Sequence, residues 1–227
     1  CKEARMIRTL LALAIVLVSS GFASAHFLYL IPAPESPGAV RLVFADGPKV
    51  DEAANLEPFT KAVVRATNLD GTAADLKADA ANPFKFASEG RQVSTRTEYG
   101  VVQRGTAAPT LIVFQADLVP TPSGTPTAGL DAGSLRLIPS LTNRELRFRA
   151  VANGKPLPNV DVLVYKPGQA KPTAARTDAE GLTPAFAEVG DYAARIHTTE
   201  SVSGEYQGRK YAAVRHYATV VTRLGEK

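Results

Sequence analysis

Three histidines carry most of the chemistry that this sequence offers: His26, His197 and His216. Neutral imidazole is a frequent ligand of nickel, cobalt, copper and zinc. The single cysteine is Cys1, which excludes thiol nucleophiles and thiolate metal sites from the rest of the chain. No G-x-S-x-G, Walker, G-x-G-x-x-G or H-E-x-x-H motif is present. The sequence therefore favours a protein that is not an enzyme and that uses imidazole to bind a metal.

His26 follows a segment with the order of a secretory signal peptide. Met6 opens it, Arg8 is basic, residues 10–18 are apolar, and Ala-Ser-Ala at 23–25 is an A-x-A cleavage site. The apolar run is shorter than the roughly 20 residues of a membrane span. We predict a natural start at Met6, a signal peptide over residues 1–25 and a periplasmic or secreted chain without a membrane span. A retained N-terminal anchor is the alternative.

Cleavage after Ala25 would give His26 a free α-amino group beside its imidazole. These two nitrogens can close a chelate ring on one transition metal ion. An α-amino group has a pKa of about 7.7–8.0 and loses its proton readily near neutral pH. The alternative interpretation is that His26 is only the first residue of a strand.

His197 is the second candidate ligand. It alternates with Arg195 and is expected on the face opposite the apolar residues Tyr192, Ala194 and Ile196. This pattern predicts a side chain that points outward or toward a neighbouring module. An ordinary surface histidine is the alternative.

His216 has a different pattern around it. It shares one face of a predicted strand with Val214, Ala218 and Val220, while Arg215, Tyr217 and Thr219 take the other. A histidine on an apolar face is either a ligand or a hydrogen-bonded core residue. If the C-terminal strand pairs beside the first strand, His216 approaches His26, and the predicted metal site is His26, His216 and His197.

Other polar residues form weaker patterns. Four acids lie in one loop region without the spacing of a calcium-binding loop, and we expect them to be solvated: Asp46, Asp51, Glu52 and Glu57.

The mature chain is predicted to carry a small net charge. The full sequence has 26 Lys and Arg and 22 Asp and Glu. Residues 1–25 hold three of the basic residues and one of the acidic residues, which leaves a net charge of +2 on the mature chain. Because the sequence contains no run of basic residues, this net charge does not indicate nucleic-acid binding.

The elements that position these residues are predicted to be strands. Alternation with a period of two appears at residues 27–31, 39–45, 61–78, 94–105, 110–116, 146–167, 190–198 and 209–224. Asn153-Gly154 and Asp70-Gly71 predict turns, and Gly181 is expected in the left-handed conformation. One short helical turn is expected within residues 48–59. These patterns indicate an all-β fold.

A segment rich in Pro, Thr and Gly divides the chain, and we interpret residues 119–140 as a linker. On either side, residues 26–118 and 141–227 are predicted to form two tandem immunoglobulin-like or transthyretin-like β-sandwich modules.

Several segments together resemble a known family: "AHFLYLIP", "RTEYGVVQRG", "ANGKPLPNVDVLVYKPG", "ARTDAEGLTPAF" and "YQGRKYAAVRHYATV". They are similar to exported bacterial proteins described as a "nickel uptake substrate-specific transmembrane region". In this resemblance His26 matches the family's alanine-histidine start and His216 its "RHYAT" ending, whereas His197 matches no motif. The tryptophan that often follows the starting histidine is absent. The pattern "GKPL…TDAEG" also occurs in transthyretin-like and carboxypeptidase-regulatory-like modules.

The resemblance implies a periplasmic protein that binds nickel or cobalt, with copper as a further candidate, and whose partners are components of a metal-uptake transporter. One alternative is a structural or adhesive β-sandwich module of the cell envelope that binds no metal. A second alternative is a copper enzyme with an N-terminal histidine site. Such enzymes usually carry disulfides and aromatic substrate surfaces, which the sequence does not indicate.

Overall fold

The computed structural model describes residues 26–50, 56–68, 71–89, 91–122 and 135–226. The predicted signal peptide and most of the predicted linker lie outside these residues. Strand β7 ends at Val119 and β8 begins at Leu135, so residues 135–140, which the sequence assigns to the linker, belong to a strand.

The regular secondary structure of the described residues consists of strands and one short 3₁₀ turn, which confirms the all-β class. None of their helical segments is long and apolar enough to cross a membrane. The elements are β1 (Phe27–Pro32), β2 (Ala39–Ala45), η1 (Glu57–Phe59), β3 (Val64–Thr67), β4 (Ala73–Asp75), β5 (Lys85–Ala87), β6 (Gln92–Val102), β7 (Thr110–Val119), β8 (Leu135–Thr142), β9 (Glu145–Ala152), β10 (Lys155–Pro156), β11 (Asp161–Tyr165), β12 (Thr173–Arg176), β13 (Gly190–Glu200), β14 (Gly204–Tyr206), β15 (Arg209–Tyr211) and β16 (Ala213–Leu224).

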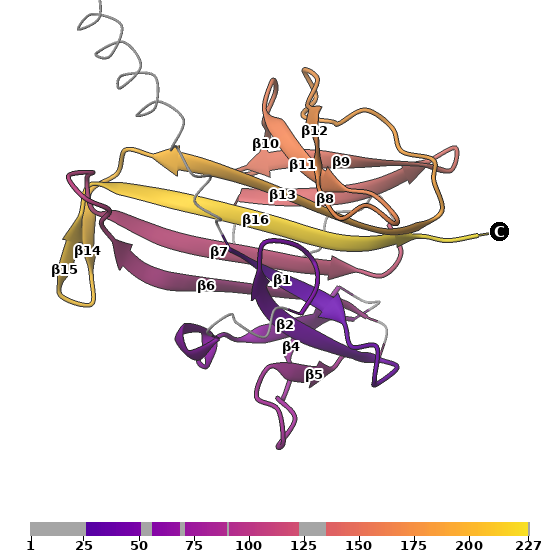
Figure 1. The fold of residues 1–227 in the computed structure, drawn as a ribbon, viewed down its shortest axis with the longest axis horizontal. Coiled ribbons are helices and arrows are strands. Elements are labelled where there is room, and N and C mark those ends of the chain that lie inside the picture. Colours follow the sequence, from indigo (N-terminus) through magenta and orange to yellow (C-terminus); the bar gives the residue numbers. More distant parts are fainter. Residues whose placement is uncertain (1–25, 51–55, 69–70, 90, 123–134, 227) are drawn as a thin grey trace, which may run out of the picture.

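One long sheet runs through the molecule in the order β12-β11-β13-β16-β7-β6-β3-β4 (Figure 1). Its neighbouring strands are antiparallel except for β7 and β16, which pair in parallel from Ala213 opposite Thr110 to Thr222 opposite Val119. Strands from the first half of the chain lie on one side of this pair, and strands from the second half lie on the other. The β7–β16 pair therefore joins both halves into one sheet.

Two smaller sheets cover opposite faces of the long sheet. Sheet β1-β2-β5 packs on one face, where the Thr219 hydroxyl donates a hydrogen bond of 2.6 Å to the Leu28 carbonyl. Sheet β10-β9-β8 packs on the other. Because side chains alternate along β16, Val221 belongs to the first hydrophobic cluster and Val220 to the second.

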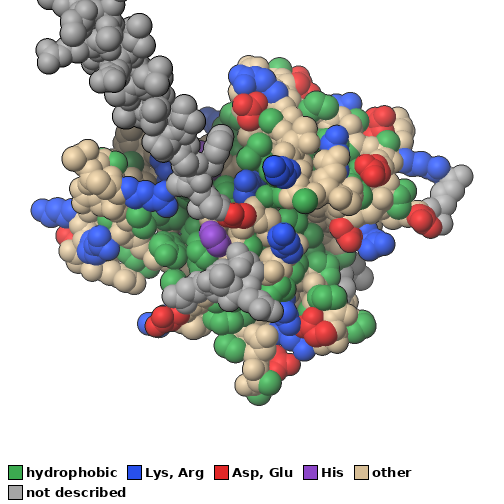
Figure 2. All heavy atoms as spheres, in the orientation of Figure 1, with side chains coloured by type: hydrophobic (Ala, Val, Ile, Leu, Met, Phe, Trp, Pro, Cys, Tyr) green, Lys and Arg blue, Asp and Glu red, His purple; other side chains and the backbone are tan. Residues whose placement is uncertain are grey.

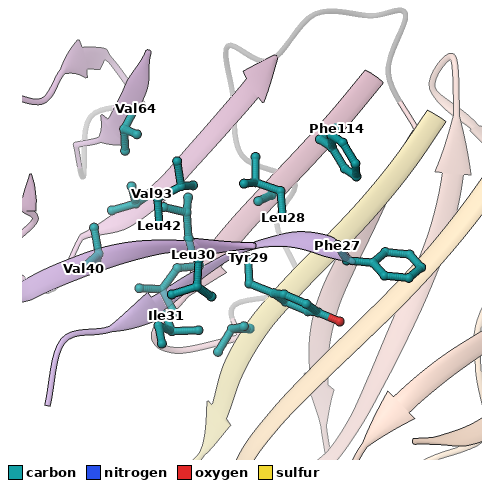
Figure 3. Packing of buried hydrophobic residues seen from close by; sticks show 14 of the residues in the cluster. Phe27, Leu28, Tyr29, Leu30, Ile31, Val40, Leu42, Val64, Val93 and Phe114 are labelled. Atoms are coloured by element: carbon teal, nitrogen blue, oxygen red, sulfur yellow. The ribbon is translucent and has the colours of Figure 1, made fainter. Parts of the chain in front are cut away.

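The first cluster takes residues from both halves of the chain. Phe27 to Ile31 of β1 lie at its centre (Figure 3). Tyr165, Ala193 and Val221 complete it from β11, β13 and β16. The two cores thus share a continuous sheet, and the division into two tandem modules is not confirmed.

The predicted pairing of the C-terminal strand beside the first strand is wrong. β1 pairs with β2, and β16 pairs with β13 and β7. Five consecutive β1 residues, Phe27 to Ile31, are buried, because β1 lies across the face of the long sheet instead of extending its edge.

The predicted turns agree with the backbone. Asn153 and Gly154 have φ of 52° and 73°, as expected for a type I′ hairpin between β9 and β10. Gly181 has φ of 73°, and a Cβ there would lie 2.7 Å from the Ala150 carbonyl oxygen. Glycine at 181 thus permits both the left-handed backbone conformation and the close approach of this turn to β9, because it has no Cβ.

A buried ion pair links β8 to the long sheet. Arg136 Nη2 lies 3.4 Å from Asp117 Oδ1, and the Gln115 amide donates to the same oxygen at 3.3 Å. Asp117 is 1% exposed and Arg136 is 8% exposed. Burial raises the pKa of the Asp117 carboxyl, and the Arg136 charge and hydrogen bond oppose that rise.

Candidate functional site

His26 lies immediately before β1 and beside the residue that follows β2. The register pairs Phe27 with Ala45, which brings the preceding residue His26 next to Asp46. His26 Nδ1 is 3.4 Å from Asp46 Oδ1, and the imidazole ring centre is 5.4 Å from that of Phe44. Local strand pairing therefore places an imidazole and a carboxylate together at one end of the small sheet.

The second half of the chain holds Asp46 in place. The Asp46 carbonyl accepts hydrogen bonds from the Tyr165 hydroxyl and, at 2.6 Å, from Arg195 Nη1. The Arg195 guanidinium also lies 4.2 Å from the ring centre of Phe27, within cation–π range. Strands β11 and β13 thus contact Asp46 and Phe27, the residue that follows His26.

A buried tyrosine lies behind this arrangement. Tyr29 is fully buried, and burial raises the pKa of its hydroxyl while the Arg195 charge lowers it. The Tyr29 hydroxyl therefore stays protonated at physiological pH and adds no negative charge near Arg195.

A cavity of about 550 Å³ lies next to His26, on the face of the long sheet that carries β1 and β2. The long strands β6, β7, β13 and β16 span 10 to 12 residues, whereas β1 and β2 span six and seven, so among the described elements β1 and β2 cover only part of this face. In Figure 2 a histidine side chain is visible beside a hydrophobic area of the surface. The described lining residues are His26, Phe27, Phe44, Tyr99, Val102, Arg104, Ala107, Ala108, Thr110, Ile112, Phe114, His197, Arg215 and Tyr217.

Aromatic rings form a continuous wall along this cavity. Phe44 stacks on Tyr99 with ring centres 6.0 Å apart, and Phe114 stacks on Tyr217 at 5.2 Å. Phe114 contacts Phe44 edge to face at 5.5 Å, which joins the two pairs. Offset and edge-to-face contacts of this kind stabilise aromatic clusters.

Tyr99 reaches this wall from a β-bulge. The register between β6 and β7 shifts between Glu98 and Gly100, which leaves Tyr99 without a cross-strand partner. Gly100 has φ of 126°, a conformation that favours glycine. A glycine inside a strand pattern is the usual signal of such a bulge, and Gly100 within residues 94–105 is the one that could have indicated it.

His197 lines the same cavity as His26. Its ring centre lies 5.6 Å from that of Tyr217, and its side chain is exposed. Partial desolvation by its neighbours lowers the pKa of His197, and the charges of Arg215 and Arg195 lower it further. The imidazole is therefore neutral at neutral pH and keeps a lone pair for a ligand.

His216 lies on the opposite face of β16. It shares that face with Val214 and Ala218, and its backbone partner on β13 is Thr198. Its side chain is half-buried and is not among the residues that line the cavity. The structure therefore brings His26 and His197 to one cavity and leaves His216 apart from them.

Burial also lowers the pKa of His216 from 6.5, with Glu200 raising it and Arg96 lowering it. The folded state thus disfavours the protonated imidazole relative to the unfolded chain. The stability that results is present above about pH 6.5 and is lost as the pH falls through the folded-state pKa.

We expect the His216→Gln variant to show a shallower loss of unfolding free energy than the parent between pH 6.5 and 5. Urea unfolding across this range measures the difference. Equal slopes in the two proteins would show that His216 is fully solvated in the folded state.

Among the described residues, no group of three or more His, Cys, Asp or Glu side chains lies close enough to hold a metal ion. Comparison with protein-family models and with curated proteins found no match. The candidate site is therefore defined by its geometry: an imidazole–carboxylate pair at the edge of an aromatic cavity, supported by residues from both halves of the chain.

Proposed function

We propose that this chain, exported and processed after Ala25, is a periplasmic or secreted protein that binds one nickel, cobalt or copper ion at His26. The observation that carries the proposal is the 3.4 Å separation between His26 Nδ1 and Asp46 Oδ1. Processing would add the α-amino nitrogen of His26, so the ion would have an amine, an imidazole and a carboxylate oxygen as ligands. His197 lines the same cavity and offers a further imidazole.

The donor set suits first-row transition metals. Amine and imidazole nitrogens favour nickel, cobalt and copper over calcium or magnesium, which prefer oxygen. Copper is expected to bind most tightly in solution, because the affinity of such sites follows the Irving–Williams order. Any preference for nickel would then depend on metal supply and on a partner, and the resemblance to a nickel-uptake family favours a transporter component as that partner.

The surroundings of Asp46 support the proposal. Its carbonyl accepts hydrogen bonds from Tyr165 and Arg195, so the tertiary structure holds the backbone of Asp46 beside His26. Residues that orient a ligand in this way commonly change metal affinity by about 10–100-fold when they are replaced.

The test compares the processed protein, whose start at His26 is verified by intact mass, with a version that carries one alanine ahead of His26. Isothermal titration with Ni²⁺ is expected to give at least about tenfold weaker binding for the extended protein, because the terminal amine becomes an amide. Binding by the processed protein should disappear below about pH 6, where imidazole and amine groups take up protons.

Two variants sharpen the comparison. Asp46→Asn keeps the size of the side chain and should weaken Ni²⁺ binding, whereas His216→Gln, on the other face of the sheet, should leave it unchanged. Equal affinity of the processed and extended proteins would show that the amine is not a ligand. If neither protein binds Ni²⁺, Co²⁺ or Cu²⁺, the structural-module alternative stands.

A further inference from the structure

The aromatic cavity extends well beyond the contact between His26 and Asp46. Its volume of about 550 Å³ lies within the roughly 300–1,000 Å³ of small-molecule sites. A single metal ion at His26 would occupy only one edge of it. The remaining lining consists of aromatic, small and basic residues, and the composition of that lining indicates what the cavity can bind.

The charged residues of the lining are basic. Arg104 and Arg215 contribute guanidinium groups, and no Asp or Glu is among the described lining residues. Within the described part of the chain, neither arginine forms an ion pair, in contrast to Arg65, Arg96 and others elsewhere on the surface. Two guanidinium groups without a carboxylate partner favour an anionic ligand, because a guanidinium can bind a carboxylate through two parallel hydrogen bonds.

Arg215 is also oriented. Its Nε donates a hydrogen bond of 3.1 Å to the Thr199 hydroxyl on the neighbouring strand β13. This contact uses the nitrogen nearest the chain and leaves the two terminal nitrogens for a ligand. An arginine held in this way loses less side-chain freedom when a ligand binds.

The aromatic lining favours a planar ring. Tyr99 is 38% exposed, and Tyr217 is partly exposed. The two tyrosines flank Phe114, with ring-centre distances of 6.0 Å and 5.2 Å to it. A flat apolar ligand would cover these aromatic surfaces.

We propose that the cavity binds a small aromatic carboxylate, whose ring packs on Tyr99 and Tyr217 and whose carboxylate pairs with Arg215 and Arg104. The proposal needs no metal at His26, and its test is therefore made with metal-free protein. Its failure would leave the metal proposal standing, and the failure of the metal proposal would leave this one standing.

The test uses 2-naphthoate as the probe, on processed protein treated with a chelator. The chain contains no tryptophan, so the fluorescence of the naphthyl ring can be followed with little interference. We expect 2-naphthoate to bind saturably. Benzoate should displace it from the cavity, whereas acetate, which has no ring, should not. Arg215→Gln and Arg104→Gln should each weaken it about tenfold, the effect of losing one charge-assisted hydrogen bond.

Arg149→Gln is the matched control, because Arg149 is exposed on β9, in the sheet on the other face, and its replacement should leave naphthoate binding unchanged. Arg104 lies in the exposed loop between β6 and β7, so Arg104→Gln still tests the proposal if Arg215→Gln is unstable. Equal affinity for the neutral analogue 2-naphthalenemethanol would overturn the role of the arginines. Absence of saturation at millimolar naphthoate would overturn the proposal altogether.

Discussion

Replacement of Arg136 by methionine is expected to lower the free energy of unfolding by about 3–5 kcal/mol, the usual result when one partner of a buried ion pair is removed. Asp117 is 1% exposed and would keep a buried charge without its cation. The loss should be smaller near pH 4 than at pH 7. In acid the carboxyl, whose pKa burial raises, takes up a proton and no longer carries an uncompensated charge.

The double variant Asp117→Val/Arg136→Met provides the control. Replacement of both partners by apolar residues is often neutral or stabilising. The free energy of unfolding of the double variant should therefore be no more than about 1 kcal/mol below that of the parent. Urea unfolding of the parent, the single variant and the double variant measures the coupling. If the single variant is as stable as the parent at pH 7, the pair is solvated and does not hold β8 against the long sheet.

Replacement of Arg195 by methionine is expected to lower the free energy of unfolding by about 2–5 kcal/mol. Methionine keeps the apolar stem but loses a charge-assisted hydrogen bond to the Asp46 carbonyl, worth about 1.5–3 kcal/mol. It also loses the cation–π contact with Phe27, worth about 0.5–2 kcal/mol. Thermal or urea unfolding measures the loss.

This variant also tests the proposed metal site. If Arg195 positions Asp46 beside His26, Ni²⁺ affinity should fall about tenfold or more even where the variant is fully folded. Tyr165→Phe removes the other hydrogen bond to the same carbonyl and should have a smaller effect in the same direction. Arg149→Met, on β9, is the control for the loss of an exposed arginine. Unchanged metal affinity in Arg195→Met would show that Arg195 does not position Asp46 for metal binding.

Much of the strand architecture could be predicted from the sequence. Residues 39–45 form β2 with the predicted bounds, and the turn at Asn153-Gly154 has the expected positive φ angles. The faces of two histidines were also predicted, His216 with the apolar residues of β16 and His197 on the face of Arg195. These features depend on local rules, namely the alternation of side chains along a strand and the backbone freedom of glycine and asparagine.

The tertiary structure decided the features that join distant segments. The parallel pairing of β7 with β16 merges the two halves into one sheet, and β1 lies across β16 instead of beside it. The side chain of Asp46 is exposed, as the loop pattern predicts, whereas its carbonyl accepts hydrogen bonds from Tyr165 and Arg195 of the second half.

The pairing of distant strands could not be predicted from the sequence, because alternation specifies which side chains share a face but not which strand edges meet. Strand edges present similar backbone donors and acceptors, so the choice between them depends on packing across the whole core. The sequence by itself therefore determined the strands, several turns and the candidate ligand His26. Only the tertiary structure decided that His26 and His197 line one cavity, that Tyr165 and Arg195 bind the carbonyl of Asp46, and that His216 lies apart from this cavity.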